Sequence, residues 1–156
     1  MSKEVVAYTD GSALRNPEGG YFGGAGAVLL YKGKEKRLSV PIPEGTNNIA
    51  ELTAAIIALE ALNESCDVKL HTDSMYVINC VTKWMDSWKK RGWKTQNKTD
   101  VKNKELIVRL DEARCNHQVE FIWVKGHDGD KYNELADELA VMASNKLKEE
   151  VLGECK

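Results

Sequence analysis

The fold class follows from two neighbouring segments, T-N-N-I-A-E-L-T-A-A-I-I-A-L-E-A-L at 46–62 and D-V-K-L-H-T-D-S at 67–74. In the first part, apolar residues recur at helical spacing from Leu52 to Leu62, which predicts a helix with one apolar face. In the second part, Val68 and Leu70 alternate with polar residues, as in a half-buried strand. Ser74 then has the position of a helix cap. A helix, a strand and a second helix in this order are typical of an α/β domain.

The segments outside this stretch complete the prediction. Upstream, three strands are expected at Val5–Thr9, Gly23–Tyr31 and Lys36–Ile42, with turns at 10–12 and 16–20. Downstream, helices are expected from Ser74 to about Asp86, over Asn103–Cys115 and over Leu135–Leu147, with a strand at Gln118–Lys125. We therefore expect a five-stranded mixed sheet flanked by helices, in which three antiparallel strands precede two parallel ones.

Length and composition indicate one domain. The chain has 156 residues, of which 42% are hydrophobic and 29% are charged, which suits a single core. We expect the domain to span residues 1–148, with a flexible tail at 149–156. No apolar run is long enough to cross a bilayer, and Met1–Glu4 does not resemble a signal peptide, so a cytoplasmic monomer is expected.

Charge is distributed unevenly along the chain. The net charge is −2, yet residues 83–104 contain eight basic and two acidic residues. Such a basic segment on an acidic body favours a part that binds phosphates and another that binds cations. A solvated charged helix and loop would explain the same pattern.

Four acidic residues form the candidate catalytic set: Asp10, Glu51, Asp73 and Asp137. Singly, each has another explanation, because aspartate is common in turns and helix caps and acids are common on solvated helix faces. Asp10 and Asp73 follow strands that are expected to be parallel, and functional sites of α/β sheets lie at the carboxyl ends of such strands. Carboxylates that meet there repel one another unless a cation lies between them, and hard oxygen ligands favour Mg²⁺ or Mn²⁺. Two such ions roughly 4 Å apart can hold a phosphodiester for hydrolysis, because one activates the attacking water and the other stabilises the leaving oxygen.

Seven short motifs occur in a consistent order over most of the chain. They are Y-T-D-G-S at 8–12, G-G-A-G-A-V-L at 23–29, T-N-N-I-A-E-L at 46–52, H-T-D-S at 71–74, W-K-K-R-G-W at 88–93, W-V-K-G-H-D-G at 123–129 and N-E-L-A-D-E-L-A at 133–140. On these motifs the sequence resembles the type 1 ribonuclease H family of stand-alone bacterial enzymes. The resemblance implies a ribonuclease H-like fold and an endonuclease that cuts the RNA strand of RNA/DNA hybrids with two Mg²⁺ ions, for which Mn²⁺ could substitute. The expected products carry 5′-phosphate and 3′-hydroxyl ends.

The resemblance also implies roles for individual residues. Asp10, Glu51, Asp73 and Asp137 would bind the metal ions, and His127 would assist proton movement or product release. The RNA strand would contact Gly11, Ser12, Ala13, Asn16, Asn47, Asn48 and Met75; all of these except Met75 stand at positions that read its 2′-hydroxyl groups. The DNA strand would contact Thr46, Trp84, Trp88, Lys89, Lys90, Arg91, Lys94 and Asn103. Turn formation by the asparagines and core packing by Trp84 and Trp88 are the alternatives.

Three positions depart from the family pattern. Met75 stands where many relatives have glutamine, Ile49 where many have arginine, and Glu44 where an arginine joins Thr46 and Asn103 in a phosphate pocket. A glutamate there repels phosphate, which weakens substrate binding or requires a different pocket. Two competing functions remain: a non-catalytic module that binds hybrids, and a DNA-cutting nuclease of related fold.

Overall fold

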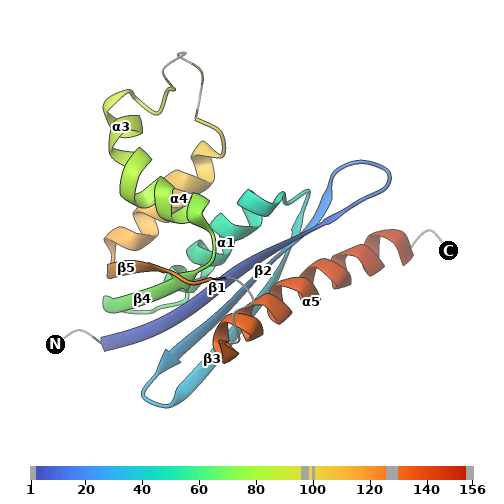
Figure 1. Ribbon diagram of the computed structural model, residues 1–156, viewed down its shortest axis with the longest axis horizontal. Coiled ribbons are helices and arrows are strands. Elements are labelled where there is room, and N and C mark those ends of the chain that lie inside the picture. Colours follow the sequence, from blue (N-terminus) through green and yellow to red (C-terminus); the bar gives the residue numbers. More distant parts are fainter. Residues whose placement is uncertain (1–2, 96–98, 100, 126–129, 154–156) are drawn as a thin grey trace.

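The computed structural model describes residues 3–95, 99, 101–125 and 130–153, and its centre is a five-stranded sheet with helices on both faces (Figure 1). The strands are β1 (Lys3–Arg15), β2 (Tyr21–Tyr31), β3 (Lys34–Pro43), β4 (Cys66–Thr72) and β5 (Gln118–Trp123). Their order is β3-β2-β1-β4-β5. The β1–β2 and β2–β3 pairs are antiparallel, whereas β4 is parallel to β1 and β5 is parallel to β4. The expected fold class is confirmed.

The central strand β1 is much longer than the sequence suggests. The predicted turn at Asp10–Ser12 is wrong, because these residues pair with Gly26, Ala25 and Gly24 of β2 and continue the strand to Arg15. Cross-strand pairing outweighs the local turn tendency of Asp-Gly-Ser here. The second predicted turn is present, and the Asn16 amide nitrogen donates to the Gly20 carbonyl across it at 3.0 Å.

The helices are α1 (Asn47–Glu60), α2 (Met75–Asn79), α3 (Met85–Lys90), α4 (Lys104–Cys115) and α5 (Lys131–Gly153). Between α2 and α3 lies a π-helical turn, η1 (Cys80–Trp84), so the single helix expected to end near Asp86 is interrupted and reaches Lys90. The last helix also runs beyond Leu147, through the first part of the expected tail. Among the described residues, no helix has the length and apolar character needed to cross a membrane.

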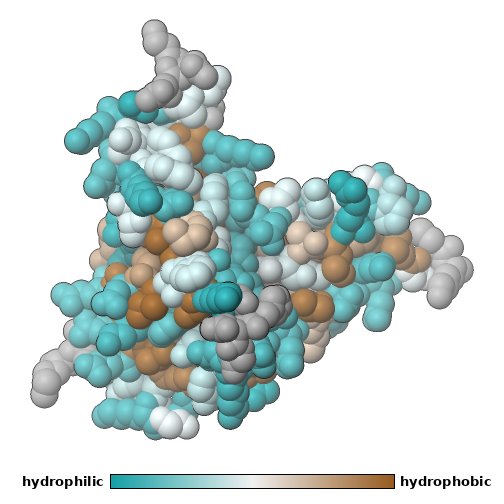
Figure 2. Space-filling model, in the orientation of Figure 1, coloured by the Kyte–Doolittle hydropathy of each residue, from teal (hydrophilic) through white to brown (hydrophobic). Residues whose placement is uncertain are grey.

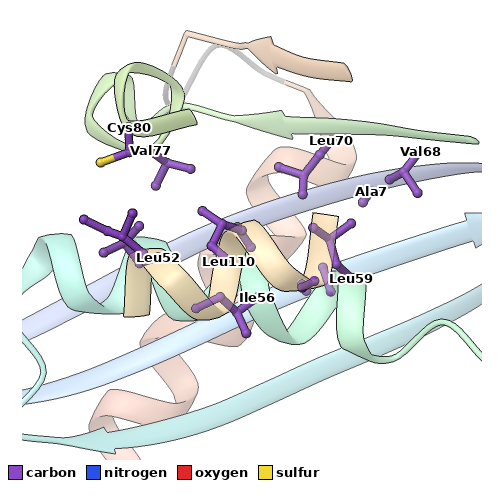
Figure 3. Packing of buried hydrophobic residues seen from close by; sticks show 14 of the residues in the cluster. Ala7, Leu52, Ile56, Leu59, Val68, Leu70, Val77, Cys80 and Leu110 are labelled. Carbon is purple, nitrogen blue, oxygen red and sulfur yellow. The ribbon is translucent and has the colours of Figure 1, made fainter. Parts of the chain in front are cut away.

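Two layers of helices enclose the sheet. On one face, Leu52, Ile56 and Leu59 of α1 pack with Leu110 of α4 against strand residues such as Leu70 (Figure 3). On the other face, α5 packs against β1, β2 and β3. The α2–α3 segment and α4 form a projection at one side of the sheet (Figure 1), and its surface is mainly hydrophilic (Figure 2).

Glycines in β2 allow α5 to approach the sheet closely. A Cβ atom on Gly26 would lie 2.2 Å from the Ala136 carbonyl oxygen, and one on Gly24 would lie 2.1 Å from the Ala140 carbonyl oxygen. Any larger residue at these positions would therefore push α5 away from β1 and β2. The motif G-G-A-G at 23–26 thus sets the position of the last helix.

Candidate active site

The parallel strands β1 and β4 place two carboxylates side by side. Their pairing runs from Lys3 and Cys66 to Thr9 and Thr72. Asp10 and Asp73 are the next residues along the chain, so both lie just beyond the last position at which β1 and β4 pair. Asp73 therefore lies at the carboxyl end of β4, as expected, whereas Asp10 lies within β1, which continues past it to Arg15 along β2.

Glu51 reaches the same point from α1. Gly11 makes the approach possible, because a Cβ atom there would lie 2.6 Å from the Glu51 amide nitrogen. The Gly11 amide donates to Glu51 Oε1 at 2.6 Å, and the Thr72 hydroxyl donates to Glu51 Oε2 at 3.4 Å. Two neighbouring strands therefore orient this carboxylate, which is only 4% exposed.

Oxygen atoms of Asp10, Glu51 and Asp73 all lie within 4.8 Å of one another. Burial is the main cause that raises the pKa of Asp10, to about 10, and the neighbouring Glu51, Asp73 and Asp137 raise it further. Burial also raises the pKa of Glu51, to about 7, with a further contribution from Asp73, although hydrogen bonds from Asp10, Gly11 and Thr72 partly oppose the shift. Without a cation, this cluster holds its negative charges at a high free-energy cost.

Asp137 joins the cluster from α5. Its carboxyl is near enough to contribute to the raised pKa of Asp10, and it lines the same hollow of about 450 Å³ as the other three acids. Gly26 is the β2 partner of Asp10, and the Ala136 backbone packs directly against the same glycine. The close approach of α5 at this point therefore brings Asp137 to Asp10.

The donor set fits a hard divalent cation. The set consists of carboxylate oxygens from three segments that are remote in sequence, with a fourth carboxylate from α5. Oxygen ligands are those that Mg²⁺ and Mn²⁺ prefer. Burial raises the pKa of Asp10 and Glu51 most, and the charge repulsion that adds to this effect is the kind that a bound cation relieves.

The residues expected to contact RNA are only partly gathered here. Gly11, Asn47, Asn48 and Met75 line the hollow, and both asparagines are exposed. Asn16 lies in the β1–β2 turn, where its side-chain oxygen accepts from the Glu18 amide at 3.0 Å, as the turn-forming alternative requires. Ser12 and Ala13 lie further along β1. The assignment of these residues to RNA stays a prediction.

The residues expected to contact DNA lie mainly on the projection. Trp84 is 38% exposed, whereas Trp88 is partly buried against the core, and their ring centroids are 5.8 Å apart. Lys89 forms an ion pair with Asp111 of α4 at 2.8 Å, while Lys90 and Arg91 are exposed. Lys94 is exposed as well.

Thr46 and Asn103, the expected phosphate-pocket pair, both have structural roles. The Thr46 hydroxyl caps α1 by accepting from the Ile49 amide at 3.3 Å. Asn103 adopts a left-handed conformation before α4 and donates to the Tyr76 hydroxyl at 3.2 Å. Glu44 is exposed.

Some predictions and omissions remain. His127 lies outside the described residues, so its role stays a prediction. Sequence reasoning missed Thr72 and Tyr76, which respectively orient Glu51 and line the hollow. The motif H-T-D-S at 71–74 was the available signal for Thr72, because it places Thr72 directly before the candidate acid Asp73.

The comparisons with known proteins agree with this geometry. The family model described as RNase H matches residues 2–145. A ribonuclease H of Escherichia coli O9:H4 (strain HS) is 54% identical over 145 residues, which cover 92% of this chain and 91% of the E. coli protein. Of the solved structures, LC9-RNase H1, described as a type 1 RNase H with the type 2 active-site motif, has a TM-score of 0.83 at 34% identity over 94% of this chain and 74% of that one. A foamy viral protease-reverse transcriptase in complex with an RNA/DNA hybrid has a TM-score of 0.79 at 26% identity, covering 92% of this chain and 20% of that one.

Fold, acidic cluster and similarity together define a nuclease with the ribonuclease H-like fold. More narrowly, the chain belongs to the RNase H family, in its type 1 bacterial branch.

Proposed function

We propose that this protein hydrolyses the RNA strand of RNA/DNA hybrids with two divalent cations, leaving 5′-phosphate and 3′-hydroxyl ends. The observation that carries the proposal is the convergence of Asp10, Glu51 and Asp73 from distant parts of the chain within 4.8 Å. The similarity to E. coli ribonuclease H and to a reverse transcriptase structure with a bound RNA/DNA hybrid supports this substrate.

Asp10, Glu51, Asp73 and Asp137 would hold the cations, which we expect to be Mg²⁺, with Mn²⁺ as a substitute. When bound, such cations polarise an attacking water and stabilise the leaving oxygen of a phosphodiester. The chain itself contributes rigid placement. Gly11 and Thr72 hold Glu51 in one orientation, and the pairing of β1 with β4 up to Thr9 and Thr72 places Asp10 and Asp73 side by side.

Substrate recognition would divide between two surfaces. Asn47 and Asn48 are exposed at the hollow, and their amides have both donors and acceptors for the 2′-hydroxyl that distinguishes RNA. Trp84, Lys90 and Arg91 lie on the projection, where an aromatic face and cationic side chains suit a nucleic-acid backbone without sequence preference. His127 would assist proton movement or product release. A cytoplasmic, monomeric protein is also part of the proposal.

Cleavage of matched substrates tests the function. The RNA strand of a labelled hybrid should be cut when Mg²⁺ is present, whereas duplex DNA and duplex RNA of the same sequence should survive. Asp73→Asn should still bind the hybrid but lose cleavage by several orders of magnitude. Asp67→Asn, on the same strand at the far end from the cluster, is the matched control and should retain full activity.

Two results would contradict the proposal. Hybrid binding by the wild-type protein without cleavage would favour the non-catalytic module, and equal cleavage of duplex DNA would favour a DNA-cutting nuclease. Analysis of the product ends tests the chemistry separately, because 5′-hydroxyl ends would exclude the proposed direction of hydrolysis.

A further inference from the structure

An aromatic stack lies next to the acidic cluster. Tyr8 of β1 and His71 of β4 are partners in the strand register, and their rings stack with centroids 4.5 Å apart and planes inclined by 13°. Asp10 and Asp73 each follow two residues later, Asp10 within β1 and Asp73 just after the end of β4. Because side chains two residues apart lie on the same face of a strand, Tyr8 lies on the same face as Asp10.

Tyr132 of α5 completes the stack. Its ring centroid lies 5.6 Å from that of Tyr8, at an interplanar angle of 35°. Tyr132 belongs to the first turn of α5, which Asp130 caps by accepting from the amides of Tyr132 and Asn133 at 3.0 and 3.2 Å. All three rings are half-buried, so they contribute packing while remaining at the edge of the core.

Two contacts near Asp137 hold α5 on the sheet. One is the backbone contact at Gly24 and Gly26, which determines how closely the middle of the helix approaches. The other is Tyr132 on Tyr8, five residues before Asp137 or about 7.5 Å along the helix axis. Without the second contact, the first turn of α5 could tilt and the Asp137 carboxyl would shift relative to Asp10.

We propose that the stack of Tyr8, His71 and Tyr132 is a positioning element that fixes the first turn of α5 on β1 and β4 and thereby places Asp137 for cation binding. The inference rests on the proposed function, because it assigns the stack a role in the same metal site. In this proposal the three rings neither bind the metal nor contact the scissile bond. Their effect reaches the site through the helix that carries Asp137.

The test removes the α5 ring and measures cation binding directly. In Tyr132→Ala, the dissociation constant for Mg²⁺ alone, measured by calorimetry on the full chain, should rise about tenfold, as is typical when support for a ligand is lost. The Mg²⁺ concentration for half-maximal cleavage should rise by the same factor, while the KM for the hybrid at saturating Mg²⁺ stays within about twofold. Tyr132→Phe keeps the ring and should bind Mg²⁺ like the wild type.

Two further variants separate positioning from general stability. Leu135→Ala removes an apolar contact from the same packing cluster but leaves the ring stack intact, so it should lower stability and leave Mg²⁺ affinity unchanged. Tyr132→Leu keeps apolar volume without the ring, and it should reproduce the weakened Mg²⁺ binding if Tyr132→Ala does not fold. Wild-type Mg²⁺ affinity in Tyr132→Ala or Tyr132→Leu, or an equal loss in Leu135→Ala, would overturn the inference while leaving the proposed function intact. A wild-type protein that neither binds Mg²⁺ nor cleaves the hybrid would overturn both.

Discussion

Replacing Asp10 by asparagine should stabilise the metal-free protein while abolishing its activity. The pKa of Asp10 is raised in the folded state from 3.8 to about 10, mainly by burial and then by Glu51, Asp73 and Asp137. Between these two values the folded protein binds more protons than the unfolded chain, so stability falls as the pH rises through this range. At pH 7, about 1.4 kcal/mol for each pH unit above the ordinary value gives an upper limit of about 4 kcal/mol. Because Glu51 shares the same repulsion, we expect Asp10→Asn to recover about 2 kcal/mol.

Urea denaturation in EDTA between pH 4.5 and 9 measures this effect. The difference in unfolding free energy between Asp10→Asn and the wild type should be small at pH 4.5 and grow toward neutral pH. Mg²⁺ should stabilise the wild type and narrow the difference, because a cation relieves the same repulsion. Asp67→Asn is the control and should show no such trend. A variant that is less stable than the wild type at pH 7 would refute the idea that the carboxylates repel one another.

Three other predictions concern the position of α5 and the projection. Gly26→Ala should lower stability by about 2 kcal/mol in thermal unfolding and reduce cleavage, because its Cβ would meet the Ala136 carbonyl. Gly153→Ala is the control and should be neutral, because a Cβ there meets open space. Equal stability of the two variants would contradict this account. Lys90→Ala with Arg91→Ala should lower the slope of log affinity against log salt by up to about 2 in hybrid-binding titrations. Lys89→Ala should change that slope less because its ammonium pairs with Asp111, and the reverse ranking would be evidence against this assignment. Trp84→Ala should weaken hybrid binding by about 1 kcal/mol or more, with little change in Tm because the Trp84 ring is partly exposed. A large fall in Tm with unchanged hybrid binding would instead indicate a packing role.

The predictable part of the fold rests on short-range patterns. Alternating residues predicted β4, and helical spacing predicted α1, because each element has one buried face. The extension of β1 through Asp10–Ser12 depends on β2, which lies beyond the local sequence window. The π-helical turn at Cys80–Trp84 likewise has no simple sequence signal, since one extra residue per turn leaves the overall apolar character unchanged.

The candidate site was predictable in composition but not in geometry. The expected strand order placed Asp10 and Asp73 side by side, whereas an acid on a helix is usually solvated and Glu51 is in fact almost fully buried. Its burial follows from Gly11, which lets α1 touch β1. The position of Asp137 likewise depends on Gly26 in another strand. Contacts between a glycine backbone and a segment far away in the sequence produce no periodic pattern of residues in either segment, so such contacts are not predicted from local sequence.

The same contacts explain how the protein keeps a repulsive cluster in place. Strand pairing fixes Asp10 and Asp73, the Gly11 amide fixes Glu51, and close backbone contact fixes α5, so none of the four acids can separate without breaking part of the core. The core therefore opposes the mutual repulsion of these carboxylates, which adds to the effect of burial on the pKa of Asp10 and Glu51. A cation that enters such a cluster gains the full attraction of carboxylates already in position, and little of that free energy is spent on rearranging the chain. It follows that a substitution that loosens the frame, such as Gly26→Ala, should weaken cation binding even though every ligand is still present.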